Sequence, residues 1–421
     1  MRILICVEFF YPSVGGAQEV VKQLALRFAS HGHDVTIATS EISERVSGTY
    51  NNLEIQSFGI SGNWVNGIVG EVDRYRAFVK ERDYDVLFIY AAQQWTFDSL
   101  IGHFDKIRAK KIFVPCGFSA LYDSSYSNYF SILPEVLRDF DALVFHSTTY
   151  RDYIFAEANG LKNLFFIPNG ADNIEFNTPK SGFRDAYQIS KTTKLLMTVG
   201  SLNGAKGHLE IAEAFSLMEA EGSLLLVLNG NKMSSHQVGI VSKFEKIRKA
   251  TLKQLFMLSI VFLIKRLRSR KDYFWRLNHL IDKINSGSLG ANKKIILTDL
   301  PREDLISCYF EANIFVFASN IEYSPLVLFE AAAAGLPFIT VDVGNSLEIV
   351  KWTKGGVICP SRFSDNGNTL VNPTELASHL DKLISKQPLL QSLGREGRRS
   401  WEENFNWDCI AKQYEQIFIN C

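Results

Sequence analysis

The sequence lacks the cysteine spacing of a metal-binding or disulfide-rich protein. Its 421 residues include six cysteines, and no two of them form a Cys-x-x-Cys pair. This spacing argues against a structural zinc site and a disulfide framework, and it predicts a reducing compartment. The opening residues "MRILICVEFFYP" contain neither a long apolar region nor a small-residue cleavage site. We therefore expect no signal peptide and a cytoplasmic protein.

The chain also lacks net charge and a membrane-spanning run. It has 45 basic and 45 acidic residues, so it offers no overall attraction to nucleic acid, and we expect no nucleic-acid partner. The apolar run "QLFMLSIVFLI" is flanked by charge, and as a helix it would be about 16 Å long, roughly half the hydrocarbon thickness of a bilayer. This run cannot cross a membrane.

Charge is nevertheless unevenly distributed. Residues 231–294 contain 15 Lys and Arg but only 3 Asp and Glu, and they surround the apolar run. One interpretation is that residues 241–284 lie on an anionic membrane surface. A second is a helical hairpin packed on its own domain with a solvated basic face, and a third is a role in RNA binding. The sequence leaves these alternatives open.

Short β-branched and aromatic runs alternate with helical patterns along nearly the whole chain, which predicts parallel sheets wound with helices. The pattern runs to about residue 171, pauses in a polar connection, and restarts near residue 194. We therefore predict an α/β protein with two Rossmann-like, doubly wound domains facing across a cleft. The predicted parts are an N-terminal domain (1–185), a C-terminal domain (186–400) with a basic helical insertion (235–290), and a C-terminal helix (401–421) that packs back on the first domain.

The expected strands have these ranges: 2–7, 34–39, 53–58, 85–90, 110–115, 142–147 and 164–168 in the first domain, and 194–200, 223–230, 293–299, 314–319, 337–342 and 356–360 in the second.

Two glutamates stand out in the apolar segment "NIEYSPLVLFEAAAAGLP". Ser324 is suited to cap a helix, Pro325 to open it and Gly335 to end it. Glu322 then lies in the loop before the helix, and Glu330 lies inside it. Taken alone, this spacing also fits a solvated loop residue and a glutamate at a helix edge.

The start of this predicted helix is suited to an anion. The N–H groups of Leu326 and Val327 have no acceptor inside the helix, and the helix dipole favours negative charge there. An ionised carboxylate can accept hydrogen bonds from two vicinal hydroxyl groups, such as those of a ribose or a sugar. The segment therefore predicts a site for a sugar nucleotide.

With this segment the chain resembles glycosyltransferase family 4, whose members have the GT-B fold and use nucleotide-diphosphate sugars. The resemblance rests on "FFYPSVGGAQEVVKQLALRFASHGHDVTIAT", "IPNGAD", "VGSLNGAKGHLEIAEAF", "EYSPLVLFEAAAAGLPFITVDVGNSLEIV" and "FNWDCIAKQYEQIF", which together cover nearly all of the chain. It implies transfer with retention of configuration and no metal or other cofactor.

The resemblance also implies residue roles. Glu330 would hold the donor ribose, and Glu322 would contact the transferred sugar. Lys206 would neutralise the diphosphate as it leaves. Gly15 and Gly16 would let the backbone approach the same diphosphate. In isolation, the two glycines also fit a tight turn and Lys206 an ordinary surface lysine.

The chain departs from the family pattern at three places. Ser201 stands where relatives carry a phosphate-binding Arg, so a second positive partner is missing. Phe88-Ile89-Tyr90 replaces a His-x-His motif, and Cys116 replaces a His, which leaves Cys116 a weak site candidate. The pairs Asp83/Asp85 and Asp139/Asp141 imitate a metal-binding Asp-x-Asp, but we interpret them as turns that enter strands.

These features give competing functions. The first is a retaining glycosyltransferase for a surface polysaccharide or glycolipid, with a glycan or lipid-linked acceptor, on the inner face of a membrane. The second is a non-catalytic relative that acts as a binding or scaffold subunit. An isomerase acting on a sugar nucleotide is a further alternative. An NAD-dependent oxidoreductase is disfavoured because the first loop lacks Gly-x-Gly-x-x-Gly.

Overall fold

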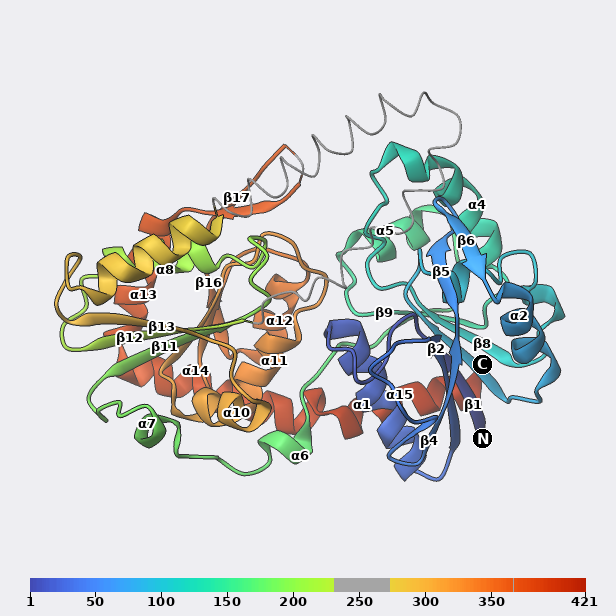
Figure 1. Ribbon diagram of the computed structural model, residues 1–421, viewed down its shortest axis with the longest axis horizontal. Helices are drawn as coiled ribbons and strands as arrows, with labels where there is room; N and C mark the ends of the chain where they lie inside the picture. The colour runs from blue at the N-terminus through green and yellow to red at the C-terminus, as the bar shows by residue number, and fades with distance from the viewer. Residues whose placement is uncertain (231–272, 366) are drawn as a thin grey trace. The chain divides into compact units, whose positions relative to one another are not determined.

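The computed structural model describes residues 1–230, 273–365 and 367–421 (Figure 1). Most of the basic insertion, including its apolar run, lies outside these residues, so the membrane-surface, hairpin and RNA interpretations of 241–284 stay predictions. Among the described residues, none of the helices combines the length and the apolar character needed to cross a bilayer.

The chain divides into two compact units. Unit 1 comprises Met1–Asn169 and Asn406–Cys421, and unit 2 comprises the described residues of Gly170–Gly239 and Glu245–Phe405. The division falls between Asn169 and Gly170, earlier than the expected boundary at 185/186. The reason is that the polar connection packs on unit 2: Gly182 and Arg184 donate backbone N–H bonds to Glu311, at 2.7 and 2.6 Å.

Unit 1 contains an eight-stranded sheet in the order β10-β9-β8-β7-β1-β2-β4-β3. All neighbouring strands are parallel except the antiparallel pair β3 and β4. Its inner strands are buried along nearly their whole length, as in a sheet covered on both faces. The strands are β1 (Arg2–Cys6), β2 (Asp34–Ser40), β3 (Thr49–Tyr50), β4 (Leu53–Phe58), β7 (Val86–Tyr90), β8 (Lys110–Val114), β9 (Ala142–Phe145) and β10 (Leu164–Phe166).

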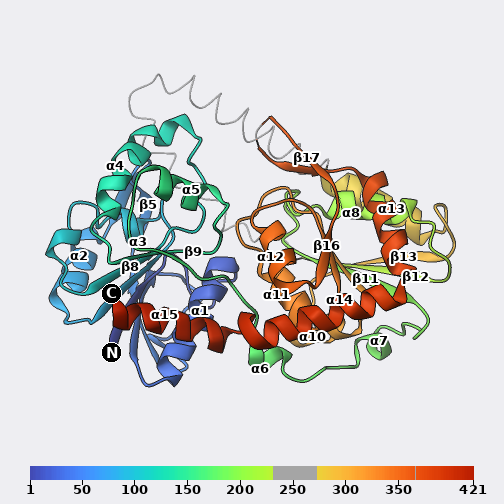
Figure 2. The same ribbon diagram turned by 180° about the vertical axis from the view of Figure 1, so that it is seen from behind.

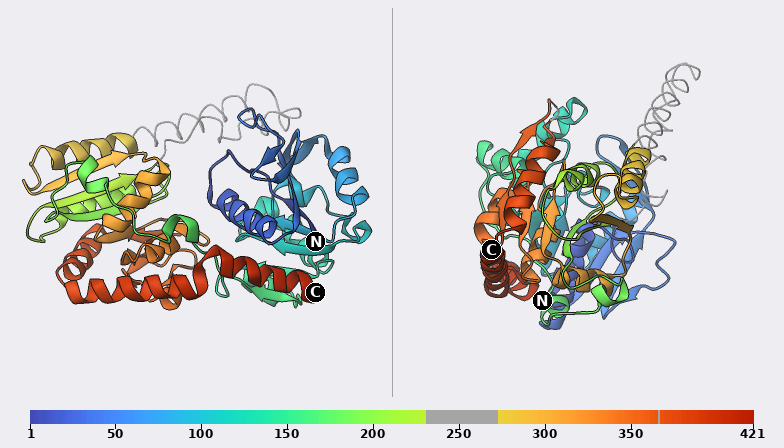
Figure 3. Two further views of the ribbon diagram at one scale, coloured as in Figure 1. Left: turned by 90° about the horizontal axis from the view of Figure 1, so that it is seen from below. Right: turned by 90° about the vertical axis from the view of Figure 1, so that its left-hand side faces the viewer.

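Unit 2 contains a six-stranded, fully parallel sheet in the order β13-β12-β11-β14-β15-β16. In the left view of Figure 3 its strands lie between the red helix α14 and the yellow helix of residues 273–285. The strands are β11 (Lys194–Val199), β12 (Leu224–Asn229), β13 (Lys293–Thr298), β14 (Ile314–Phe317), β15 (Phe338–Thr340) and β16 (Gly356–Ile358). The prediction of two wound parallel sheets is confirmed.

Two small hairpins were not predicted, because each is a short antiparallel pair without a long apolar run. They are β5 (Ile60–Asn63) with β6 (Gly67–Gly70), and β17 (Ser361–Phe363) with β18 (Thr369–Val371).

Helices cover both sheets. In unit 1, α15 packs on α1, as Figures 1 and 2 show, through an edge-to-face contact of Phe28 and Phe418 and an Arg27 Nε–Asp408 Oδ1 ion pair of 3.1 Å. Asn406 caps α15 by accepting the N–H of Cys409. The helices of this unit are α1 (Gly16–Ser30), α2 (Val72–Glu81), α3 (Trp95–Asp98), α4 (Ser127–Leu137), α5 (Arg151–Ala158) and α15 (Trp407–Asn420).

In unit 2, the polar Asn372 side chain caps α13 and Pro373 opens it, which are common features of a helix start. The named helices of this unit are α6 (Asn173–Phe176), α7 (Phe183–Ala186), α8 (His208–Leu217), α10 (Arg302–Glu311), α11 (Leu326–Ala333), α12 (Ser346–Thr353), α13 (Pro373–Ile384) and α14 (Gln387–Ser400).

Each sheet has one position where the chain reverses its direction of progress. In unit 2 this position lies between β11 and β14, and in unit 1 it lies between β1 and β7. Ligands of open α/β sheets bind beyond the carboxyl ends of the strands at such a switch point. The loops that follow these four strands are therefore the places to look for functional groups.

Candidate active site

Two loops meet at the switch point of unit 2. The loop after β11 and the loop after β14 are joined because Asn320 N donates to Ala205 O at 2.8 Å and Ser319 Oγ donates to the same oxygen at 3.0 Å. Gly207 completes the contact with φ +72°, and a Cβ there would lie 2.0 Å from Ala318 O. Only glycine allows this approach.

The two predicted catalytic residues face each other across this junction. Lys206 Nζ lies 2.5 Å from Glu322 Oε1, and the two side chains are 26% and 15% exposed. The pair unites residues 116 positions apart in the chain, and each sits on a loop held by backbone hydrogen bonds. A partly exposed lysine at this position can donate hydrogen bonds to phosphate oxygens.

The helix that follows Glu322 starts slightly differently from the prediction. Helix α11 begins at Leu326, and Pro325 is the residue before it, without a side-chain cap. Ser324 does not cap the helix, because its Oγ accepts instead from Asn345 Nδ2 at 3.2 Å. Gly335 ends the helix with φ +66°, as predicted. The expected role of Ser324 as a helix cap is therefore wrong.

Leu326 and Val327 form the first turn of α11 and are half-buried. Their N–H groups precede the first intrahelical hydrogen bonds, so they remain available to a ligand. The helix has eight residues and follows directly on the loop of Glu322. Ser201 lies in the loop after β11, where its carbonyl accepts from Asn203 N at 2.8 Å.

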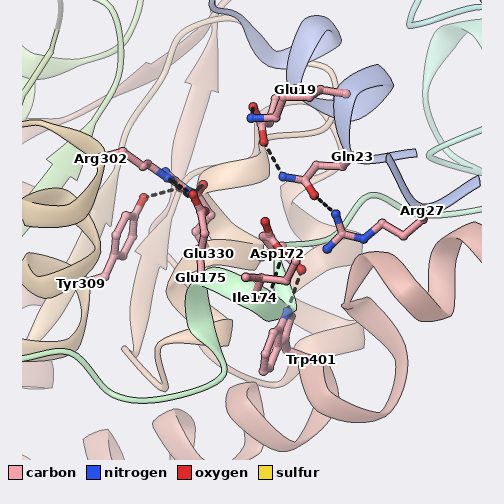
Figure 4. A network of polar contacts seen from close by, with 12 residues as sticks. Glu19, Gln23, Arg27, Asp172, Ile174, Glu175, Arg302, Tyr309, Glu330 and Trp401 are labelled. Atoms are coloured by element: carbon pink, nitrogen blue, oxygen red, sulfur yellow. Dashed lines mark hydrogen bonds and ion pairs between the residues drawn. The ribbon is translucent and has the colours of Figure 1, made fainter. Parts of the chain in front are cut away.

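Glu330 is held in a polar network inside unit 2 (Figure 4). Its Oε1 accepts from Arg302 Nη2 at 2.6 Å, and its Oε2 accepts from the hydroxyl of Tyr309 at 3.0 Å. Burial and the neighbouring carboxylate raise the pKa of Tyr309 well above its usual range, so the phenol stays a donor. Arg302 also contacts Glu175 of α6. The sequence did not suggest these three partners.

Gly15 and Gly16 lie in unit 1, at the start of α1. Gly15 has extended backbone angles and caps the helix without a side-chain bond, and a Cβ on Gly16 would meet nothing within 4 Å. Neither residue needs to be glycine for conformational reasons. A Cβ on Gly15 would, however, lie 2.5 Å from Gln18 Oε1, so this side chain would have to move.

The switch point of unit 1 has two carboxyl groups. Glu8 follows β1, and Asp98 lies at the end of α3 after β7. Burial, with Asp98 nearby, raises the pKa of Glu8 to about 7, and burial raises the pKa of Asp98 to about 6. Asp98 accepts from Trp64 N at 2.9 Å and from Tyr129 Oη at 2.8 Å.

The backbone around these carboxyls is strained. Positive φ values occur at Ala91 and Gln93 after β7, and at Cys116 and Phe118 after β8. Burial raises the pKa of the Cys116 thiol to about 12, so this residue is not a thiolate nucleophile at neutral pH.

The remaining candidates have structural explanations. Asp83 forms a 2.8 Å ion pair with Arg2, and Asp141 accepts the N–H of Lys111, so both Asp-x-Asp pairs lie at the amino ends of strands. His146 is buried between Tyr90 Oη and the carbonyl of Ile167, and burial lowers its pKa to about 4.

The chain is similar in sequence to known glycosyltransferases. Residues 279–400 match the family model "Glycosyl transferases group 1". The matched range includes Glu322 and Glu330. The protein is a glycosyltransferase-type enzyme. Over 423 aligned positions the chain is 22% identical to N-acetyl-alpha-D-glucosaminyl L-malate synthase of Bacillus anthracis, covering 97% of this chain and 95% of that one.

Solved structures give the fold. Sucrose-phosphate synthase from Thermosynechococcus elongatus superimposes with a TM-score of 0.69 at 17% identity, covering 99% of this chain and 98% of that one. Anabaena HepE in complex with UDP-glucose superimposes with a TM-score of 0.67 at 14% identity and full coverage of both chains. The chain has the GT-B fold.

Proposed function

We propose that the protein is a retaining glycosyltransferase of family 4 that takes a sugar from a nucleotide-diphosphate donor and passes it to a hydroxyl group. One observation carries the proposal: Lys206 and Glu322 form an ion pair across the switch point of the unit 2 sheet, beside the free N–H groups of α11. The likeness to a protein solved with UDP-glucose supports a nucleotide-sugar donor.

In this proposal the ribose hydroxyls bind Glu330, and the diphosphate docks between Lys206 and the first turn of α11. Ser201, Ser324, Leu326 and Val327 line the same docking position. Lys206 leaves Glu322 for the phosphate oxygens, because the diphosphate carries more negative charge than one carboxylate. Glu322 then accepts hydrogen bonds from the transferred sugar.

The transfer step is a substitution at the anomeric carbon. The bond from this carbon to the diphosphate oxygen breaks, and a bond to the acceptor oxygen forms on the same face. The proton of the acceptor hydroxyl passes to the leaving diphosphate. Lys206 stabilises the negative charge that develops on the diphosphate, an effect that is large in a preorganised site.

We further propose that the acceptor is a glycan or a lipid-linked glycan of a surface polysaccharide or glycolipid, and that the enzyme works at the inner face of the cytoplasmic membrane. Similarity to the capsular polysaccharide biosynthesis glycosyltransferase CapM of Staphylococcus aureus, 28% identical over 116 residues, supports the first part. The basic composition of 231–294 is the support for the second. Gly15 and Gly16 keep their proposed role of admitting a phosphate to the backbone.

The test uses radiolabelled UDP-, GDP- and ADP-sugars with the purified protein and with its Glu322→Ala variant. We expect one donor to release its labelled sugar to water or to an added glycan or lipid acceptor, and the variant to do so at least 100-fold more slowly. Tight nucleotide binding without turnover on any acceptor would instead support the scaffold function.

A further inference from the structure

Arg302 joins two acidic side chains from different elements of unit 2 (Figure 4). Its Nε lies 3.1 Å from both carboxylate oxygens of Glu175 on α6, and its Nη2 lies 2.5 Å from Glu175 Oε2. The same Nη2 lies 2.6 Å from Glu330 Oε1 on α11. The guanidinium therefore occupies the space between carboxylates 155 positions apart in the chain, which would repel each other without it.

This arrangement fixes the orientation of Glu330. Arg302 donates to one carboxylate oxygen and Tyr309 donates to the other, so the carboxylate plane cannot rotate without losing a bond. Each oxygen of an ionised carboxylate has two acceptor positions. One position on each oxygen remains, and the Glu330 side chain is 12% exposed. Two adjacent hydroxyl groups match these two remaining positions.

We propose that Arg302 is a positioning residue that sets the Glu330 carboxylate for the vicinal 2′- and 3′-hydroxyls of a ribonucleotide, and that Glu175 holds Arg302 in place. The inference rests on the proposed function, in which Glu330 meets the donor ribose. The network then favours binding of ribose over 2′-deoxyribose. A sugar without its 2′-hydroxyl leaves one of the two remaining acceptor positions of the Glu330 carboxylate unpaired.

The geometry requires arginine rather than any cation. Nε and Nη2 form one edge of the planar guanidinium, and this edge faces both oxygens of Glu175 while Nη2 also reaches Glu330. A lysine offers a single nitrogen that cannot reproduce this fixed pattern. The Arg302 side chain is 40% exposed, and the side chains of Glu175 and Glu330 are 25% and 12% exposed.

The experiment measures the dissociation constants of UDP, GDP and ADP, and of their 2′-deoxy forms, by calorimetry. We expect the unmodified protein to prefer the ribo form of its own nucleotide at least tenfold. Arg302→Met reduces this preference to less than threefold, and Arg302→Lys retains an intermediate preference. Arg276→Met is the matched control, because Arg276 forms a partly exposed 3.3 Å ion pair with Glu213 in the same unit; it keeps the full preference.

Glu175→Gln gives a second variant that retains Arg302, should Arg302→Met fold poorly, and we expect it to lose part of the preference. Full preference for the ribo form in a folded Arg302→Met or Glu175→Gln protein would overturn the positioning role, even if its Tm were lower. Binding of none of the nucleotides to the unmodified protein would overturn the proposed function itself.

Discussion

The two sheets carry different pairs of side chains at their switch points. One pair has opposite charges, and the other consists of two carboxyl groups. At the switch point of unit 2, Lys206 and Glu322 form a pair of opposite charges. At the switch point of unit 1, Glu8 and Asp98 are two carboxyls whose pKa values are raised to about 7 and about 6. In the proposed function Lys206 exchanges its carboxylate partner for a phosphate, whereas the raised pKa values of Glu8 and Asp98 keep protons on these carboxyls at higher pH than usual.

The backbone conformation also differs between the two switch points. In unit 1, the loop after β7 contains two non-glycine residues with positive φ, Ala91 and Gln93. In the described loops of unit 2 at residues 200–207 and 318–325, the positive φ values belong to glycines. Doubly wound topology therefore sets where a site lies, and the loop residues set its chemistry.

The largest effect is expected from Lys206→Ala. Without this cation the charge on the leaving diphosphate is not stabilised, and kcat should fall by about 100- to 1,000-fold, with a smaller change in KM. Steady-state kinetics with the identified donor checks this. Lys206→Arg is the control and should retain more of the rate. A change confined to KM would show that Lys206 only binds the donor.

Glu330→Ala should act on binding instead. It removes two charge-assisted hydrogen bonds to the donor, and the Kd for the nucleoside diphosphate should rise roughly 10- to 100-fold. Calorimetric titration measures this. The surface variant Glu213→Ala, in the same unit, should leave the Kd unchanged. An unaltered Kd in Glu330→Ala would show that the donor ribose does not bind at Glu330.

The variant Glu8→Gln tests the raised pKa of Glu8 at the switch point of unit 1. Because the folded state raises the pKa of Glu8 from 4.5 to about 7, its contribution to the free energy of unfolding is most favourable below pH 4.5 and is lost as the pH rises through 7. Glu8→Gln removes the charge, and among the described residues the Glu8 carboxyl forms no side-chain hydrogen bond that this change would break. It should stabilise the protein by about 2 kcal/mol at pH 8 and very little at pH 4.5.

Thermal unfolding of both proteins at the two pH values measures this difference. Equal shifts at pH 4.5 and pH 8 would show that Glu8 already carries its full charge near neutral pH. The difference in carboxyl protonation between the two switch points would then be smaller than the structure indicates.

The smallest effect concerns stability at the unit 2 switch point. The Lys206–Glu322 pair is partly exposed, so Lys206→Ala should change the free energy of unfolding by less than about 1 kcal/mol. Chemical denaturation checks this value. A loss of several kcal/mol would mean that the kinetic defect of the same variant reflects a damaged fold.

The sequence predicted the sheets well because buried parallel strands are continuous apolar runs, and each strand expected from 2–7 to 356–360 occurs in the structure. It also predicted that Glu322 lies in the loop before the helix that the structure shows as α11. It did not predict Arg302 or Tyr309 as partners of Glu330, because contacts between distant elements leave no local pattern. The burial that raises the pKa of Glu8 is equally invisible in the sequence.

The most direct test is a crystal structure of the protein with the nucleoside diphosphate it binds. The account predicts the diphosphate within hydrogen-bonding distance of Lys206 Nζ and the N–H groups of Leu326 and Val327, with the ribose hydroxyls on Glu330. A nucleotide bound away from the carboxyl ends of β11 and β14 would contradict it.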